Sequence, residues 1–377
     1  MRLSLGALRA LAVTSALAAA RALDLGTGQS ARLAGCTGGC DRVNDELKAE
    51  VDDGFPSRPG RQSWSDQLMK VVQGGSSSPC SADIVATSYG RYMGFCSRMN
   101  TFADELFAAV YRGRSFSLCQ SNKDRFIDRI WSPHFKNIAN FSMCASPKGF
   151  CEHGNSWDTL HVANNFAAKL KWFDHEYLED FMRFLYPYIF TLAEGTQHLV
   201  DQRLESAGLV AGEPYVAIHV RHGDKTSGIH REAEPIEADS YADAARSLLL
   251  GRRSGAGAAA LRGLLLGQLR AANASVVYVA SDDDGAAEAI GAALGGGVRV
   301  LQQPRGSGAS YQSRGYEADE DLVSLLTDVE ALRRARAFVG TASSNVGRLV
   351  YLLRPKGSAS ISLDKGGNWM WRTLQQV

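Results

Sequence analysis

The sequence predicts an α/β protein whose second half contains a parallel β-sheet with helices on both faces. Short apolar runs alternate there with stretches of helical period. The runs are apolar throughout, as is typical of buried parallel strands, and three of them end in clusters of polar residues. Repeated strand–helix units of this kind favour a doubly wound, Rossmann-like sheet.

The elements of this half follow one another closely. Apolar strands are predicted at residues 215–220, 276–280, 298–301 and 337–340. Helices are predicted at residues 241–250, from Gly263 to about residue 270, and at residues 286–294, 319–336 and 346–353. The Gly- and Ser-rich segments at residues 251–263 and 303–317 are expected to be loops.

The first half has a weaker pattern. Residues 24–80 are rich in Gly, Ser, Asp and Arg, which indicates an irregular lead-in. A strand at residues 84–87, a helix after Gly94 and a strand at residues 115–118 form the first regular unit, and residues 121–160 read as loops and short helices.

The longest helical pattern spans residues 172–206. Its aromatic stripe, which includes Tyr177 and Phe181, is typical of a core-facing surface rather than of a cofactor site. Pro187 is expected to bend or break this helix. Residues 208–214 resemble a linker, so we expect one cysteine-containing α/β domain at residues 23–208 and a second domain at residues 209–377.

Composition limits the function classes. The 377 residues allow two domains with large cores, and the 45% hydrophobic fraction fits a globular protein. The 41 Lys and Arg balance 40 Asp and Glu, for a net charge of +1. Such a balance offers no electrostatic footprint for nucleic acid or for an anionic membrane.

The first 22 residues predict a secretory signal peptide. Arg2 and Arg9 give a basic start, and the uncharged run Ala10–Ala20 is too short to span a bilayer. The alternative is an organelle transit peptide, because no acidic residue precedes Asp24. No other stretch is predicted to cross a membrane, so a location in the secretory pathway follows.

All cysteines lie in the first 151 residues: Cys36, Cys40, Cys80, Cys96, Cys119, Cys144 and Cys151. This clustering favours disulfides formed in an oxidising compartment, with at least one thiol left over from the odd total. Zinc is the alternative, but no paired CxxC spacing supports it. The sequons at Asn140 and Asn273 are compatible with a lumenal location.

Three predicted strands end in polar clusters. Arg221, Asp224 and Lys225 follow the first strand, Ser281–Asp284 follow the second, and Thr341–Asn345 follow the last. Because parallel strands end at one edge of a sheet, these clusters should line a single crevice. Arg221 is suited to a phosphate.

The turn Thr341–Asn345 precedes a predicted helix. The free backbone N–H groups and the positive end of the helix dipole would suit a phosphate, and Ser344 could add a hydroxyl. The alternative is that Ser343 is simply a helix N-cap.

Asp328 falls at the border of the apolar arc of the helix at residues 319–336. A partly desolvated carboxylate seeks donors, and guanine would supply an N–H and an amino group. The alternative is a solvated residue at the edge of the helix.

The triplet Asp282–Asp284 matches the loose D-x-D pattern by which some glycosyltransferases hold a divalent cation against a diphosphate. Such triplets are also common in turns. Arg221 and a helix N-terminus could neutralise a diphosphate without a metal, so none is expected.

Several of these motifs resemble one family. The segment His219-Val220-Arg221-x-x-Asp224-Lys225, followed by Pro235-Ile236-Glu237, is similar to the signature of α1,6-fucosyltransferases, which include the eukaryotic core enzymes and the bacterial nodulation enzymes. The resemblance covers about residues 172–365, and its further motifs are Ala280–Asp283, Asp328, Thr341, Ser343, Ser344, Val346, Arg348 and Ser362–Asp364.

The resemblance implies a two-domain, GT-B-like glycosyltransferase of the Golgi lumen. It implies inverting transfer of fucose from GDP-fucose, without metal or cofactor, to a glycan or glycoprotein acceptor such as an N-glycan or a chitooligosaccharide. The alternatives are a protein O-fucosyltransferase, an enzyme that uses another GDP-sugar, or an inactive relative that binds a nucleotide sugar or glycan.

The family roles carry over by position. Arg221 would grip the β-phosphate, while Lys225 and a carboxylate would serve the acceptor hydroxyl. Glu232 is favoured over Glu234 as the general base. The residues assigned to GDP-fucose are His219, Arg221, Asp224, Asp282, Asp283, Asp328, Ser343 and Ser344, with His219 and Asp328 on the guanosine and Ser344 on the diphosphate.

Departures from the family pattern also occur. His222 stands where the family has a second arginine. Gly340 and Gly347 replace two family cysteines that flank the serine turn, so a local disulfide is not expected there.

Overall fold

The computed structural model describes residues 64–74, 84–87, 94–113, 115–119, 131–141, 143–144, 177–221, 235–250, 275–303 and 319–364. By its internal contacts the chain divides between residues 38 and 39, and every described residue belongs to the second unit. The predicted signal peptide at residues 1–22, the segment at residues 251–270 and most of the predicted loop at residues 303–317 lie outside the described residues.

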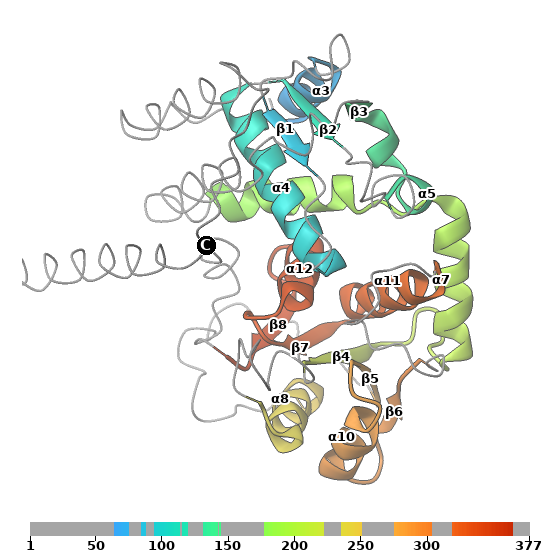
Figure 1. Ribbon diagram of the computed structural model, residues 1–377. Coiled ribbons are helices and arrows are strands. Elements are labelled where there is room, and N and C mark those ends of the chain that lie inside the picture. Colours follow the sequence, from blue (N-terminus) through green and yellow to red (C-terminus); the bar gives the residue numbers. More distant parts are fainter. Residues whose placement is uncertain are drawn as a thin grey trace, which may run out of the picture. The chain divides into compact units, whose positions relative to one another are not determined.

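A five-stranded, fully parallel sheet forms the central layer of the second half (Figure 1). Its strand order is β6-β5-β4-β7-β8. The strands are β4 (Tyr215–Val220), β5 (Val276–Ser281), β6 (Arg299–Leu301), β7 (Ala337–Gly340) and β8 (Ala359–Ser362). The chain runs outward from β4 to β6 and then returns to β7 on the other side of β4, so the strand order reverses between β4 and β7.

The predicted α/β class and Rossmann-like sheet are confirmed, with β8 as a strand that the sequence pattern did not predict. Three of its four residues are only partly buried, and two of the four are serines. An edge strand of this kind lacks the continuous apolar run that identifies a buried parallel strand.

Helices cover both faces of this sheet (Figure 1). The pairs are α8 (Ala238–Leu250) with α10 (Ala286–Leu294), and α11 (Asp319–Arg334) with α12 (Asn345–Leu353). Val216, Ile218 and Val220 pack in the core of α8 and α10. Tyr215 and Ala217 pack in the core of α11 and α12. Alternate residues of β4 face opposite sides of the sheet, because side chains of a strand alternate with a period of two residues. The same alternation determines which site residues lie on the same face.

A second, three-stranded parallel sheet has the order β1-β2-β3. Its strands are β1 (Ile84–Thr87), β2 (Phe116–Cys119) and β3 (Met143–Cys144), with α4 (Phe95–Arg112) connecting the first two. Gly113 ends α4 in the left-handed region at φ 64°, and its N–H bonds back to the carbonyls of Ala109 and Val110. Two separate parallel sheets agree with the predicted GT-B-like class, while the boundary at residues 208 and 209 stays a prediction.

Short elements connect to β3. They are α5 (Ser132–His134) and the 3-10 helix η4 (Asn137–Asn140). They agree with the short helices predicted within residues 121–160, whereas the strand β3 in the same range was not predicted.

The expectation that residues 24–80 are irregular is wrong for α3 (Trp64–Gly74). Trp64, Leu68, Val71 and Val72 are all buried, at the spacing of one helix face. The Trp64 ring packs edge-on against Phe181, with 5.1 Å between ring centroids. Because the residues around this short apolar stripe are rich in Gly and Ser, the sequence pattern did not predict the helix.

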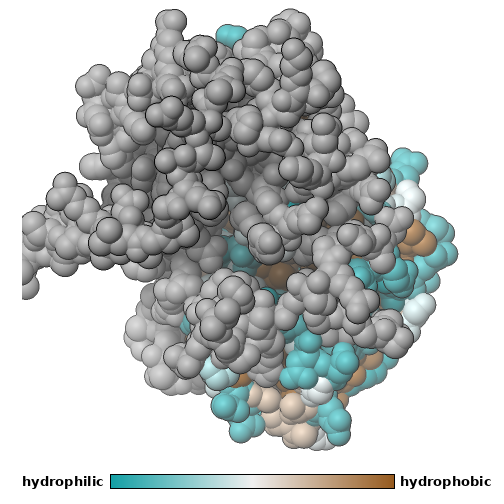
Figure 2. Space-filling model, in the orientation of Figure 1, coloured by the Kyte–Doolittle hydropathy of each residue, from teal (hydrophilic) through white to brown (hydrophobic). Residues whose placement is uncertain are grey.

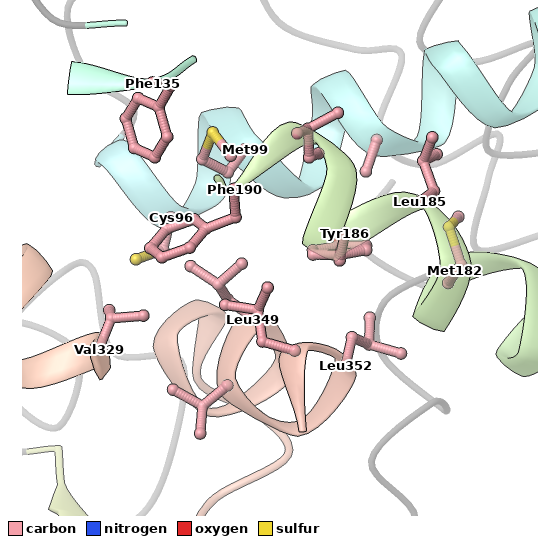
Figure 3. Packing of buried hydrophobic residues seen from close by; sticks show 14 of the residues in the cluster. Cys96, Met99, Phe135, Met182, Leu185, Tyr186, Phe190, Val329, Leu349 and Leu352 are labelled. Atoms are coloured by element: carbon pink, nitrogen blue, oxygen red, sulfur yellow. The ribbon is translucent and has the colours of Figure 1, made fainter. Parts of the chain in front are cut away.

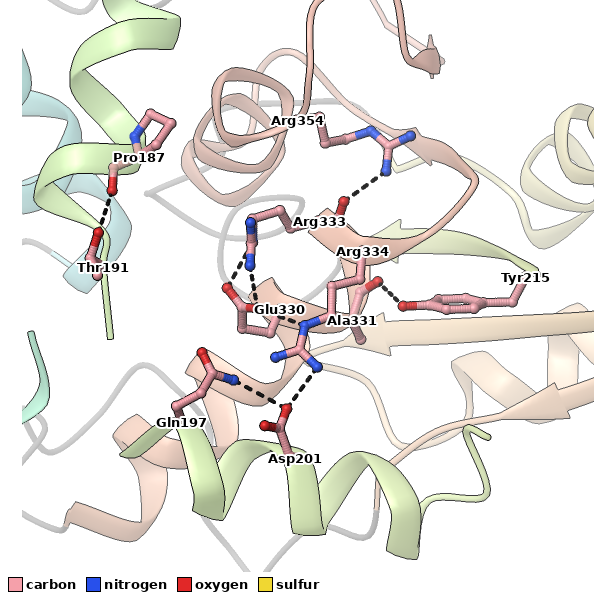
Figure 4. A network of polar contacts seen from close by, with 10 residues as sticks. All are labelled: Pro187, Thr191, Gln197, Asp201, Tyr215, Glu330, Ala331, Arg333, Arg334 and Arg354. Atoms are coloured by element: carbon pink, nitrogen blue, oxygen red, sulfur yellow. Dashed lines mark hydrogen bonds and ion pairs between the residues drawn. The ribbon is translucent and has the colours of Figure 1, made fainter. Parts of the chain in front are cut away.

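The long helix is broken shortly after Pro187, in agreement with the expected bend or break. The chain stays helical through residues 177–189, is interrupted at residues 190–193, and resumes as α7 (Glu194–Ser206). The Thr191 hydroxyl donates to the Pro187 carbonyl at 2.7 Å (Figure 4). The interruption pairs with α5, since the N–H of Ala193 bonds to the carbonyl of His134 at 2.8 Å. The backbone groups at the break are therefore paired with the segment that contains α5.

Most side chains in the core between α4, residues 177–189, α11 and α12 are apolar (Figure 3). Met99, Leu185 and Leu349 are fully buried there. Tyr177 and Phe181 are buried as well, which confirms that the aromatic stripe of residues 172–206 faces the core.

Cys96 is a free, buried thiol in this core. Cys36, Cys40, Cys80 and Cys151 lie outside the described residues, as do the side chains of Cys119 and Cys144. The backbone register of β2 and β3 pairs Cys119 with Cys144. The predicted disulfides stay a prediction.

The described surface in Figure 2 is mostly hydrophilic with smaller apolar areas. The large exposed apolar side chains among the described residues are Met69, Leu199 and Val210. Within the same residues, no helix combines the length and the apolar character needed to cross a membrane.

Glu105 offers a test of the α4 packing. Both of its carboxylate oxygens are buried without a hydrogen-bond partner, and burial raises the pKa of this carboxyl well above its usual range. The unfolded chain therefore releases this proton at lower pH, so the group lowers stability increasingly as the pH rises above about 4.5.

We expect Glu105→Gln to raise the free energy of unfolding at pH 8 by about 1–3 kcal/mol, and the gain to shrink toward pH 4.5. Urea titrations across this pH range measure the effect. The control is Glu288→Gln, because Glu288 of α10 is exposed. It should change neither the free energy of unfolding nor its dependence on pH. A gain that does not depend on pH would contradict the assignment.

Candidate functional site

The candidate site lies at the carboxyl edge of the five-stranded sheet, where the strand order reverses between β4 and β7. Ligands of doubly wound sheets bind at such a switch point. Arg221 follows β4, Asp282 follows β5 and the turn Thr341–Ser344 follows β7. Val220 pairs with Ser281 in the ladder, so the ends of β4 and β5 are level. Arg221, Ser281–Asp284 and Thr341–Asn345 thus lie at one edge of the sheet, as predicted, while Asp224 and Lys225 of the first cluster lie outside the described residues.

Arg221 is anchored by Asp282. Its Nη1 donates to the Asp282 Oδ2 at 2.5 Å. The Asp282 side chain is 3% exposed, whereas the Arg221 side chain is 22% exposed. A buried carboxylate therefore orients a guanidinium that still reaches the solvent, which is a suitable arrangement for binding an anion.

Asp283 stabilises the turn before α10. Its Oδ1 accepts the N–H of Gly285 at 2.9 Å, and its own N–H donates to the Ser281 hydroxyl at 3.0 Å. Asp282 and Asp283 of the triplet thus have structural roles, and those of Asp283 are of the kind expected for a turn. Among the described residues, no group of three or more His, Cys, Asp and Glu side chains is placed to hold a metal ion.

His219 is a buried, neutral imidazole on β4. Its Nδ1 has no hydrogen-bond partner. Burial, and to a lesser extent the charge of Arg221, lowers the pKa of His219 to about 3. At neutral pH the ring can therefore contact a ligand as an uncharged donor or acceptor, but not as a cation.

Asp328 is buried rather than at a solvated edge. Its carboxylate is part of α11, is 4% exposed as a residue, and accepts the Tyr278 hydroxyl at 2.7 Å. Tyr278 reaches it because alternate residues of β5 face α11. The sequence indicated a partly desolvated carboxylate in need of donors, but gave no signal for Tyr278 as one of them.

Replacing Tyr278 with phenylalanine tests this pair. We expect Tyr278→Phe to lower the free energy of unfolding by about 1–3 kcal/mol, because a buried carboxylate loses a donor. Urea denaturation measures the loss. Tyr215→Phe is the matched control, since the Tyr215 hydroxyl donates to a neutral acceptor, the Ala331 carbonyl, at 2.7 Å. A loss no larger than that of the control would argue against a charged acceptor.

The serine turn differs in detail from expectation. Ser344, not Ser343, is the N-cap residue of α12, and its side chain makes no capping hydrogen bond. The N–H groups of Ala342 and Ser343 are not free for a phosphate, because they donate to the two carboxylate oxygens of Asp364 at 2.7 and 3.0 Å. What α12 can offer an anion is its first turn and the Ser344 hydroxyl.

A buried polar network supports this turn from behind. Arg348, 2% exposed, donates to the Ala342 carbonyl at 3.3 Å and to the Asn345 side chain. The Asn100 amide of α4 donates to the same Asn345 Oδ1 at 3.0 Å, and Tyr186 donates to Asn100 at 2.9 Å. The start of α12 is therefore fixed by α4 and by the helix of residues 177–189.

Cys96 lies in the first turn of α4. Burial raises the pKa of its thiol to about 12, and the charges of Arg221 and Arg348 act in the opposite direction. The thiol is thus protonated and unreactive at neutral pH. The hydrogen bond from Asn100 of the same helix to Asn345 places α4 beside the start of α12.

The proposed acceptor side is not described. Asp224, Lys225 and both candidate bases, Glu232 and Glu234, lie outside the described residues, as does His222. Their roles stay predictions.

Solved structures similar to this chain include fucosyltransferases. NodZ from Bradyrhizobium matches 74% of this chain and 95% of its own, at 14% identity and a TM-score of 0.43. A variant of Arabidopsis thaliana FUT1 in complex with GDP matches 85% of this chain and 80% of its own, at 12% identity and a TM-score of 0.43. POFUT1 in complex with GDP matches 75% of this chain and 98% of its own, at 13% identity and a TM-score of 0.38. By sequence, neither a protein-family model nor a curated protein matches the chain.

Proposed function

We propose that this protein is an inverting fucosyltransferase that transfers fucose from GDP-fucose to a glycan acceptor. The observation that carries the proposal is the Arg221–Asp282 pair, which lies at the carboxyl edge of the sheet where α12 also begins. A cation oriented by a buried carboxylate and a helix N-terminus together suit a diphosphate. The motifs that resemble α1,6-fucosyltransferases contain these same residues.

The donor base would lie over the face of the sheet covered by α11. The buried Asp328 carboxylate and the neutral His219 ring are the polar groups that we assign to guanosine. Guanine offers an N–H and an amino group to a carboxylate, which adenine does not offer in the same arrangement. This assignment predicts a preference for GDP over ADP.

The chemical step needs charge stabilisation on one side and a base on the other. As the bond between fucose C1 and the β-phosphate oxygen breaks, Arg221 and the first turn of α12 would stabilise the negative charge on GDP. The acceptor hydroxyl would attack C1 from the opposite face, and Glu232 or Glu234 would take its proton, with Lys225 nearby. We place this reaction in the lumen of the secretory pathway.

Metal removal gives one test of the donor site. Because Arg221 and α12 can neutralise the diphosphate, we expect transfer activity to persist in EDTA. The assay compares rates with EDTA, with added Mg²⁺ and with added Mn²⁺. Loss of activity in EDTA that Mn²⁺ restores would assign a cation to the triplet Asp282–Asp284 instead.

The acceptor test uses GDP-fucose with a panel of N-glycans, chitin oligosaccharides and folded protein domains. Transfer to a glycan, with an inverted anomeric centre in the product, is the expected result. Transfer to protein side chains would favour a protein O-fucosyltransferase. GDP binding without transfer to any acceptor would favour an inactive relative, and no GDP binding would refute the proposal.

A further inference from the structure

We propose that Asp364 is a positioning residue that fixes the serine turn for binding of the donor diphosphate. This inference rests on the proposed function, because it concerns the same site. Asp364 belongs to the motif Ser362–Asp364, and none of the family roles given above falls on it.

Asp364 follows β8, the edge strand beside β7. Gly340 and Ser362 pair in the ladder of β7 and β8, and the N–H of Leu363 donates to the Gly340 carbonyl at 2.9 Å. The ends of the two strands are therefore joined immediately before the serine turn. This register brings Asp364 to the turn although 21 residues separate it from Ser343.

Both carboxylate oxygens of Asp364 are used in hydrogen bonds. Oδ1 accepts the N–H of Ala342 at 2.7 Å and the Ser362 hydroxyl at 2.8 Å, while Oδ2 accepts the N–H of Ser343 at 3.0 Å. The Ser362 oxygen in turn accepts the N–H of Ala342 at 2.9 Å. Successive N–H groups that converge on an anion form a nest, and here the protein supplies the anion itself.

This nest fixes the direction in which the chain enters α12. With Ala342 and Ser343 held, the next groups along the chain are the Ser344 hydroxyl, which does not cap the helix, and the first turn of α12. Those are the groups that we assign to the diphosphate. A turn that is fixed before binding avoids the entropy of ordering it when the ligand arrives.

The opposite role for Asp364 is a block, in which its carboxylate occupies the phosphate position until GDP displaces it. Three donors would then have to be given up, and Ser362, which holds the carboxylate, belongs to the sheet itself. The geometry therefore favours positioning. The two roles predict effects of opposite sign, because removing a positioning group weakens GDP binding and removing a block strengthens it.

The experiment compares wild-type protein with Asp364→Asn and Ser362→Ala. Calorimetry measures GDP affinity, and steady-state kinetics separate the KM for GDP-fucose from kcat and from the acceptor KM. We expect Asp364→Asn to weaken GDP binding and to raise the donor KM about tenfold, with the acceptor KM unchanged. Ser362→Ala should act in the same direction with a smaller effect, and it keeps the test available if Asp364→Asn does not fold.

Asp243→Asn is the matched control, because Asp243 is an exposed residue of α8 paired with Arg246. It should leave GDP affinity unchanged. Unchanged or tighter GDP binding in folded Asp364→Asn would overturn the inference. Absence of GDP binding in the wild-type protein would instead refute the proposed function, so the two failures are distinguishable.

Discussion

Replacing Arg221 with alanine is expected to weaken GDP binding by at least about a hundredfold. The substitution would remove the proposed charge-assisted, bidentate contact to phosphate, and about 3 kcal/mol corresponds to that loss in affinity. Arg221→Lys should recover only part of it, because an ammonium keeps the charge but not the fork. Calorimetric titration with GDP measures both variants.

The Asp282 partnership makes this prediction specific. Arg221→Ala also deprives a buried carboxylate of its Arg221 partner, which is expected to lower the free energy of unfolding by about 1–3 kcal/mol. Combining it with Asp282→Asn should recover stability but not GDP binding. If the double variant recovered binding as well, the loss in Arg221→Ala would reflect unfolding rather than a lost phosphate contact.

The control for Arg221→Ala is Arg299→Ala. Arg299 belongs to β6 of the same sheet and pairs with Glu213 at 2.5 Å, with its side chain 48% exposed. Exposed pairs of this kind contribute little to stability. We expect GDP affinity to be unchanged in this variant. Equal losses in both variants would remove the basis for assigning Arg221 to the diphosphate.

The sheet was predictable from sequence where its strands are buried on both faces. All residues of β4, β5 and β7 are buried, so each strand appears as a continuous apolar run. The strand β8 was not predictable, because an edge strand with partly exposed serines has no such run. The helix α3 was missed because only four of its apolar residues are buried and the sequence around them is polar.

The position of the site was predictable for a topological reason. Parallel strands bring their carboxyl ends to one edge, so Arg221, Asp282 and the serine turn had to be neighbours. The hydrogen-bond partners of Asp328 and of the serine turn were not predictable, because each lies far away along the chain. Tyr278 is 50 residues from Asp328, and Asp364 is 22 residues from Ala342. Such contacts depend on strand order and register, which local patterns do not contain.

Arg354 also makes contacts that local sequence patterns do not predict, and we expect its loss to lower stability more than the loss of Tyr278. This residue ends α12, is 3% exposed, and has no motif around it. Its guanidinium donates to five backbone carbonyls, which belong to Leu332, Arg333, Ala335, Arg336 and Ala359, at 2.7 to 3.3 Å. Figure 4 shows the bond to Arg333. One side chain thus satisfies the carbonyls that the end of a helix leaves unpaired.

We expect Arg354→Leu to lower the free energy of unfolding by about 3–5 kcal/mol, because it leaves several buried carbonyls without donors. Burial lowers the pKa of Arg354 to about 10, so the group is still charged at neutral pH and its charge supports these bonds. Arg354→Lys should lose less, since its three donors can reach part of the set.

Guanidinium chloride titrations of the two Arg354 variants and of Arg246→Leu measure these differences. Arg246 is the control, because within the described part of the chain it bonds to one backbone carbonyl, that of Ala293, and its side chain is 40% exposed. A loss in Arg354→Leu no larger than that of the control would mean that water replaces the guanidinium at the end of α11. The expected ranking, with Arg354→Leu lowest, Arg354→Lys between and Arg246→Leu closest to wild type, follows from how many buried carbonyls each change leaves without a donor.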